Sequence, residues 1–182
     1  MKSIPNVLSA ARLALAPYLF LLLWRRHYQM ALAVCFLAGV TDALDGWTAR
    51  RLKASSRLGA YLDPVADKIL LSGAFLTLAL GHAIQPWLAM LVLGRDLMIL
   101  AFAGGAFAFT TLRSFPPSLW GKASTAAQII FILVLLLWLC GWADERLPRL
   151  MTWITAALTG GSGLDYGLRG VRYIRVFQHS SQ

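Results

Sequence analysis

Half of the eight acidic residues of this chain lie in one stretch, DALDGWTARRLKASSRLGAYLDPVAD, at positions 42–67. Asp42 and Asp45 are spaced i and i+3, and Asp63 and Asp67 are spaced i and i+4, so each pair would share one face of a helix. Four facing carboxylates repel one another in surroundings of low dielectric constant unless cations neutralise them. Oxygen donors without nearby His or Cys suit Mg²⁺ or Mn²⁺ better than zinc. We therefore predict that these four aspartates are the ligands of a two-metal site.

Two hard cations held by carboxylates commonly serve phosphoryl transfer, because they stabilise both the attacking and the leaving oxygen. Gly46 would let a ligand approach the helix backbone, and Gly59 would do the same from the connecting segment. Arg50 could hold a diphosphate with its planar guanidinium group. The alternative is structural, since an aspartate can cap a helix and Asp67 can pair with Lys68 or an arginine. That alternative explains one aspartate more readily than all four together.

The segments around this stretch are strongly apolar. The chain has 58% hydrophobic and 14% charged residues and a mean hydropathy of +0.64, which is unlike a soluble globular domain. Several apolar stretches approach the roughly 20 residues with which a helix crosses a bilayer. These stretches are approximately 7–24, 28–40, 69–84, 87–109, 123–142 and 147–159. We expect an all-α, polytopic integral membrane protein with about six transmembrane helices, and not a soluble helical bundle.

Two of these helices would position the aspartates. One helix that begins at Tyr28 and continues through Arg50 would carry the first pair. A second helix that begins near Asp63, with Pro64 in its first turn, would carry the second pair. The segment 51–62 contains serines and a glycine and can turn the chain back. The two pairs can then face each other at the edge of the membrane.

The basic residues are distributed unevenly between alternate connections. The two termini, segment 50–57 and segment 113–122 hold eleven Lys and Arg, whereas the opposite connections hold four. This asymmetry predicts that both termini and the aspartate stretch face the cytoplasm, and we expect a bacterial inner membrane. The net charge of +9 is explained by attraction of helix ends to anionic lipid headgroups, so we expect no nucleic-acid partner.

The aspartates also form part of a longer pattern. Asp42-x-x-Asp45-Gly46-x-x-Ala49-Arg50, followed after eight residues by Gly59-x-x-x-Asp63-x-x-x-Asp67, resembles the signature of the CDP-alcohol phosphotransferases. The first residues, Ile4-Pro5-Asn6 with Ser9 and Arg12, are similar to the family's amino-terminal segment, although related enzymes often carry Thr in place of Ser9. Ser162-Gly163-Leu164-Asp165-Tyr166 is similar to the last-helix segment of the glycerophospholipid branch.

This resemblance implies one membrane domain over 1–182, with six helices and a short amphipathic amino-terminal segment, in a homodimeric enzyme. Such an enzyme cleaves CDP-diacylglycerol: an acceptor hydroxyl attacks the β-phosphorus, and CMP leaves. By position, Asp42, Asp45 and Asp63 would be metal ligands, and Asp67 would join them and act as general base. The residues that would line the cytidine-diphosphate site are Gly46, Ala49, Arg50 and Gly59.

The acceptor is predicted from shorter patterns. Gly121-Lys122, with Thr125 and Gln128 following, is similar to a pattern of the phosphatidylglycerol and cardiolipin branch. Arg95-Asp96 followed by apolar residues looks more like CMP-forming cardiolipin synthases than like phosphatidylglycerophosphate synthases. We therefore favour phosphatidylglycerol as acceptor.

Two alternatives remain open. Glycerol 3-phosphate is the second candidate acceptor, because Arg113 and Lys122 could hold its phosphate. Arg95 would either contact a lipid or acceptor phosphate or form an ion pair between helices. A cation transporter with an Asp-lined site is the alternative of another class. It would spread its polar residues over several helices at mid-membrane depth.

Overall fold

The computed structural model describes residues 4–52, 59–109 and 118–179, and it describes the side chains of 14–40, 68–101 and 118–168. These residues form six helices and no strand, which confirms the all-α prediction. The helices are α1 (Ile4–Trp24), α2 (Tyr28–Leu52), α3 (Gly59–Leu80), α4 (Pro86–Phe109), α5 (Leu119–Leu139) and α6 (Arg146–His179). The expected amphipathic amino-terminal segment is not separate, because α1 is continuous from Ile4.

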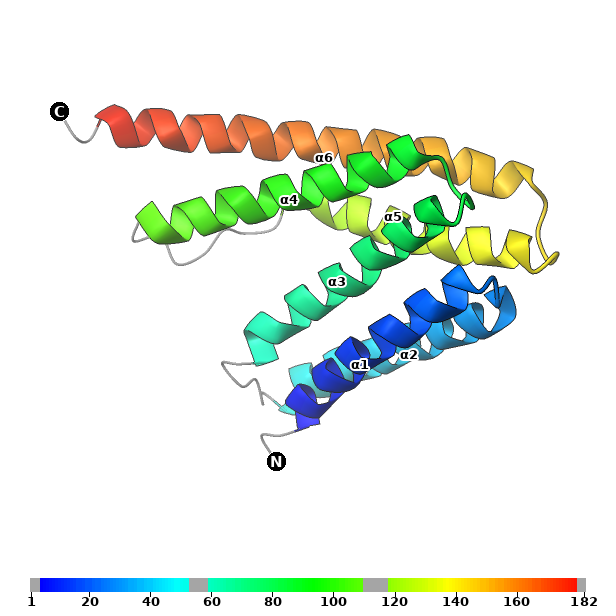
Figure 1. The fold of residues 1–182 in the computed structure, drawn as a ribbon. Helices are drawn as coiled ribbons and strands as arrows, with labels where there is room; N and C mark the ends of the chain where they lie inside the picture. Colours follow the sequence, from blue (N-terminus) through cyan, green and yellow to red (C-terminus); the bar gives the residue numbers. More distant parts are fainter. Residues whose placement is uncertain (1–3, 53–58, 110–117, 180–182) are drawn as a thin grey trace.

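The helices alternate in direction, so their connections gather at two ends of the molecule (Figure 1). The beginning of α1, the end of α2, the beginning of α3 and the ends of α4 and α6 lie on the left of the view. The connections 25–27, 81–85 and 140–145 lie on the right. Helix α5 packs on α6 and α2, α1 packs on α3 and α2, and α4 packs on α6 and α3. The described ends of α2, α3 and α4 lie at the same end of the molecule as the start of α1 and the end of α6, as the predicted arrangement requires.

The three connections on the right share one helix ending. In each, a residue with positive φ follows the helix: Arg26 at 60°, His82 at 56° and Gly141 at 78°. Its N–H and the next N–H bond back to the last turn, as in His82 to Ala79 O at 3.0 Å and Ala83 to Leu78 O at 2.9 Å. This is the Schellman pattern, in which carbonyls left free by the helix end are satisfied. The chain therefore reverses sharply at this end.

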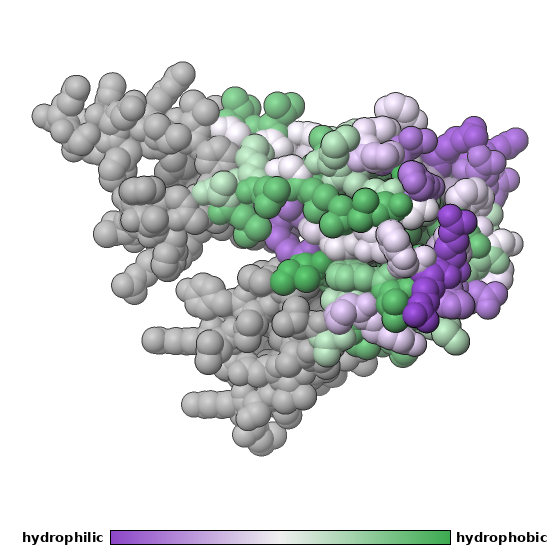
Figure 2. Space-filling model, in the orientation of Figure 1, coloured by the Kyte–Doolittle hydropathy of each residue, from purple (hydrophilic) through white to green (hydrophobic). Residues whose placement is uncertain are grey.

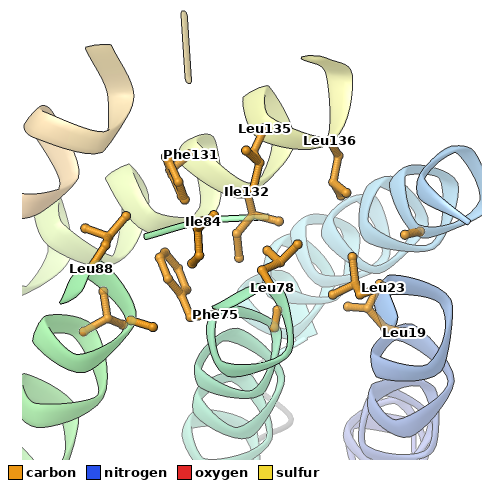
Figure 3. Close-up of a cluster of buried hydrophobic side chains, with 14 of the residues drawn as sticks. Leu19, Leu23, Phe75, Leu78, Ile84, Leu88, Phe131, Ile132, Leu135 and Leu136 are labelled. Carbon is orange, nitrogen blue, oxygen red and sulfur yellow. The ribbon is translucent and has the colours of Figure 1, made fainter. Parts of the chain in front are cut away.

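An apolar core lies near the same end and joins five helices. Its buried side chains include Leu19 and Leu23 of α1, Phe75 and Leu78 of α3, and Leu88, Phe131 and Leu135 of α4 and α5, with Ala31 of α2. Figure 3 shows these large side chains gathered in one cluster. The rings of Phe75 and Phe131 stack with centroids 5.6 Å apart. Burial of these side chains fixes α3 between α1 and α5.

The outer surface of the bundle is apolar. Every helix exposes large hydrophobic side chains there, for example Leu21, Phe36, Leu76, Met90, Ile130 and Trp153. Figure 2 shows hydrophobic residues over the middle of the described surface and hydrophilic residues at the right end. Within the described residues, only Leu119–Leu139 is long and apolar enough to cross a bilayer, and the apolar parts of α1, α2 and α3 are shorter. Spanning by all six helices thus stays a prediction.

Candidate active site

The two carboxylate pairs lie on two successive helices, as predicted. Asp42 and Asp45 belong to α2, and Asp63 and Asp67 belong to α3. Each pair therefore shares one helical face. The connection 53–58 limits the distance between Leu52 and Gly59 to about 25 Å at full extension. For these aspartates and for Gly46, Ala49, Arg50 and Gly59 the structure describes the helical backbone alone, and Arg113 lies outside the described residues.

One detail of the prediction is wrong. Helix α3 begins at Gly59 and not near Asp63, so Pro64 does not stand in its first turn. A proline inside a helix removes one backbone hydrogen bond, and membrane helices tolerate this loss when neighbouring groups satisfy the freed carbonyl. Helix α1 likewise contains Pro17. Consequently Asp63 is not at the helix start, where an aspartate would serve as an N-cap.

The donor set of the predicted metal site fits a hard divalent cation. Four carboxylates supply only oxygen, the ligand atom that Mg²⁺ and Mn²⁺ prefer. Among the side chains that the structure describes, no group of three or more His, Cys, Asp or Glu could hold a metal ion. The four aspartates are outside that set, so their role as ligands stays a prediction.

Arg95 is buried on α4 and donates to three helices. Its Nε and Nη2 donate to the Ser162 hydroxyl at 3.2 and 3.0 Å, and Nη2 also donates to the Gly121 carbonyl at 3.4 Å. Nη1 donates to Oδ1 of Asp96 at 2.7 Å. The guanidinium carbon lies 5.8 Å from the centroid of the Tyr166 ring. Arg95 thus joins α4 to α5 and α6 through hydrogen bonds to neutral groups, whereas its described ion pair is with Asp96 of its own helix and not with another helix as the structural alternative expected.

Asp96 extends this network to α3. Its Oδ1 accepts from Lys68 Nζ at 2.6 Å, and its Oδ2 accepts from the Ser72 hydroxyl at 2.9 Å. The carboxylate thus lies between the ammonium of Lys68 and the guanidinium of Arg95. A buried anion is stable only when such partners compensate its lost hydration. Lys68 pairs with Asp96, and its alternative partner Asp67 has a side chain outside the described residues.

Helices α5 and α6 meet through buried hydroxyl and amide groups. The Ser124 and Thr159 hydroxyls are 3.1 Å apart, and Gln128 Nε2 donates to both, at 3.3 and 3.2 Å. The Thr155 hydroxyl donates to the Ala127 carbonyl at 3.4 Å. These side chains recur every three or four residues, so they form one polar line along each helix. Gln128, part of the branch-specific pattern, accordingly faces α6.

Lys122 is exposed in the first turn of α5. Ser118 caps this helix, because its hydroxyl accepts from the Gly121 N–H at 3.0 Å. The Ser118 N–H donates to the Tyr166 hydroxyl at 3.1 Å, which fixes the helix start against α6. Because its side chain is exposed, Lys122 can be reached by an anion from solution, whereas Arg95 is buried.

Sequence reasoning missed part of this arrangement. Ser162 and Tyr166 stood in a segment similar to the glycerophospholipid branch, so their positions could have been singled out. Ser72 carried no signal, because a serine in an apolar segment predicts no partner.

A pocket of about 420 Å³ lies between His82, Trp138 and Arg149, at the end of the molecule opposite to the predicted site. Of the predicted site residues whose side chains the structure describes, none lines it.

Comparison with known proteins identifies the family. Residues 2–160 match the family model of CDP-alcohol phosphatidyltransferases. This range includes both carboxylate pairs. The chain belongs to the CDP-alcohol phosphatidyltransferase family. This is a family of membrane-associated transferases.

The relatives within this family carry two different names. The chain is 32% identical to the CMP-forming cardiolipin synthase of Homo sapiens, over 97% of the chain and 64% of that protein. It is 34% identical to the enzyme of that name from Streptomyces coelicolor, over 94% and 81%. It is 30% identical to the CDP-diacylglycerol--glycerol-3-phosphate 3-phosphatidyltransferase of Aquifex aeolicus, over 94% and 98%. The chain thus spans less than two thirds of the human cardiolipin synthase.

Proposed function

We propose that this CDP-alcohol phosphatidyltransferase family member transfers a phosphatidyl group from CDP-diacylglycerol to a glycerol-type hydroxyl and releases CMP, in glycerophospholipid biosynthesis. The observation that carries the proposal is that the family match includes the carboxylate pairs of segment 42–67. The helical backbone at both pairs supports it, because each pair then shares a face. The relatives' names agree with this reaction class.

In the proposed reaction, the acceptor hydroxyl attacks the β-phosphorus of CDP-diacylglycerol. Asp67 accepts the hydroxyl proton, since a carboxylate beside the reacting phosphorus is a suitable general base. A new oxygen–phosphorus bond forms, the bond from this phosphorus to CMP breaks, and CMP retains the electron pair. Arg50 would stabilise the charge on the diphosphate. Gly46, Ala49 and Gly59 would leave room for the nucleotide.

The four aspartates would hold the cations of this site. Mg²⁺ or Mn²⁺ bound to Asp42, Asp45, Asp63 and Asp67 would neutralise charge on the diphosphate and on the departing CMP. The protein's own part would be to bring the carboxylates of α2 and those of α3 to one site. Chelation of divalent cations is therefore expected to abolish CMP release, and Mg²⁺ or Mn²⁺ should restore it.

We favour phosphatidylglycerol as acceptor, with cardiolipin as product. The support is the Arg95-Asp96 pattern, which is similar to that of CMP-forming cardiolipin synthases. Glycerol 3-phosphate, giving phosphatidylglycerophosphate, is the second candidate, and the exposed Lys122 supports it because a free ammonium can bind a phosphate. Relatives of both names are similarly identical to the chain, so this choice depends on the residues.

The test measures CMP release by purified protein in detergent micelles. The protein is given CDP-diacylglycerol and Mg²⁺ or Mn²⁺, with phosphatidylglycerol in one reaction and glycerol 3-phosphate in the other. We expect CMP and cardiolipin in the first reaction. CMP and phosphatidylglycerophosphate in the second reaction alone would assign the other acceptor. A cation transporter would release no CMP in either reaction, and that result would overturn the proposal.

A further inference from the structure

Three segments that are distant in sequence meet at Arg95. They are the Arg95-Asp96 pair of α4, the beginning of α5 at Ser118–Gly121, and Ser162–Tyr166 of α6. The backbone of Gly121 lies close to the guanidinium of Arg95, since a Cβ built at Gly121 would stand 3.2 Å from Arg95 Nη2. The convergence brings together patterns that the proposed chemistry of the aspartates does not use.

The guanidinium of Arg95 has little capacity left for a substrate. Its Nε, Nη1 and Nη2 all donate to protein acceptors, and Arg95 is 7% exposed. A phosphate that bound the guanidinium through two N–H groups would have to displace one of these acceptors, because four of the five N–H groups already donate to them. Displacement would leave a buried polar group without its partner. The contacts therefore favour an indirect role for Arg95 over contact with the acceptor.

The network reaches the proposed active site through α3. Lys68 directly follows Asp67, and Ser72 lies one turn further along the same helix. Both donate to the carboxylate of Asp96, at 2.6 and 2.9 Å. Two donors one turn apart that bind a single carboxylate restrict both rotation and sliding of α3 against α4.

We propose that the Lys68–Asp96–Arg95–Ser162 network is a positioning device for the proposed active site, on which this inference rests. Asp96 holds the turn of α3 that follows Asp67, and Arg95 holds Asp96 against α5 and α6. The aspartates of α3 thereby keep one orientation relative to the rest of the bundle. Arg95 and Asp96 are positioning residues in this proposal, and they touch neither substrate nor metal.

The test compares Asp96→Asn with two matched variants. Asp96→Asn preserves the size of the side chain but removes the negative charge that pairs with Lys68 and Arg95. Lys68→Arg keeps the charge and serves as the conservative variant. Glu145→Gln is the control, because it removes an exposed ion pair with Arg149 at the opposite end. Cooperative unfolding in detergent, followed by tryptophan fluorescence, shows which variants are folded.

The kinetic result distinguishes positioning from substrate contact. Because small displacements of catalytic groups are costly, we expect kcat of Asp96→Asn to fall about 10²-fold, with an unchanged KM for the acceptor. Lys68→Arg should retain most activity, and Glu145→Gln all of it. A wild-type kcat in folded Asp96→Asn would overturn the inference. A higher acceptor KM with unchanged kcat in Arg95→Lys would also overturn it, and would indicate substrate contact.

A second readout does not depend on turnover. Binding of Mn²⁺ to the purified protein, measured by electron paramagnetic resonance, should be weaker in Asp96→Asn than in the wild type. Equal Mn²⁺ affinity in the two folded proteins would overturn the inference. If the wild type releases no CMP but binds Mn²⁺ more tightly than Asp96→Asn does, the proposed function is overturned and the positioning role is not.

Discussion

At the scale of single residues, the aspartates have different proposed duties. Asp42, Asp45 and Asp63 are assigned to metal binding, whereas Asp67 is assigned both to metal binding and to accepting the proton. This difference arises because only one carboxylate needs to reach the acceptor hydroxyl. Replacement of Asp67 should therefore affect the chemical step more than it affects the fold.

Asp67→Asn is expected to lower kcat by at least about 10²-fold, because an amide cannot accept the acceptor's proton. The measurement is CMP release under saturating substrates. Asp144→Asn is the matched control: Asp144 is exposed, and its carboxylate only accepts the Arg146 N–H at the opposite end. Normal turnover by Asp67→Asn would remove Asp67 from the role of base.

Gly121 illustrates a requirement for the absence of a side chain. An added Cβ would stand 2.9 Å from the Tyr166 hydroxyl, which is fixed because it accepts the Ser118 N–H. Gly121→Ala should therefore destabilise the protein by about 1–3 kcal/mol, the usual cost of overpacking. Thermal unfolding in detergent measures this change.

Gly160→Ala on α6 is the control for this substitution. No atom lies within 4 Å of a Cβ built there, and alanine favours a helix over glycine by up to about 1 kcal/mol. Its melting temperature should be unchanged or higher. Equal effects of the two substitutions would contradict the close packing assigned to Gly121.

At the scale of elements, the helix endings on one side repeat a single geometry with different residues. Arg26, His82 and Gly141 adopt the left-handed conformation, and only glycine adopts it without a steric penalty. The backbone hydrogen bonds at each ending show that the geometry is the same. The penalty at the two non-glycine positions is therefore stored in the native state.

His82→Gly should stabilise the protein, because it removes a steric cost of about 1 kcal/mol in the left-handed region. Gly141→Ala should destabilise it by a similar amount. Chemical or thermal unfolding of the two variants in the same detergent measures both changes. Changes of the same sign in the two variants would show that these connections do not control the helix endings as described.

At the scale of the whole molecule, the apolar outer surface and the grouping of connections favour a bilayer environment. Six helices alternate in direction, so the described connections 25–27, 81–85 and 140–145 share one end. Arg25, Arg26, Arg146 and Arg149 are the basic residues near the first and last of these connections. The more basic end, by the charge asymmetry, should face the cytoplasm.

Cysteine labelling tests this orientation. In a variant with Cys35 and Cys140 replaced by serine, Asp144→Cys should react with a membrane-impermeant maleimide on intact cells. A cysteine added after Gln182 should react only after permeabilisation. The reverse pattern would invert the predicted topology, and reaction of both cysteines on intact cells would contradict a shared cytoplasmic end for the termini.

Local sequence patterns are sufficient to predict the all-helical class of the protein, and the prediction of a metal site in segment 42–67 also depends on local patterns alone. Each predicted apolar stretch overlaps one helix of the structure. Hydropathy can locate such helices because a long apolar stretch is a local property of the sequence. Carboxylates at helical spacing predict a shared face without knowledge of any partner. For the same reason Asp42, Asp45, Asp63 and Asp67 could be assigned to two helices before the fold was known.

Contacts between residues of different helices could not be predicted from local patterns. The partners of Arg95 are Ser162 and Gly121, and those of Asp96 include Lys68 and Ser72. No spacing along the chain relates these residues, since their contact depends on how α3, α5 and α6 pack around α4. The start of α3 at Gly59 was likewise not predicted, because proline is a local signal and a helix can continue through it when packing compensates the lost hydrogen bond.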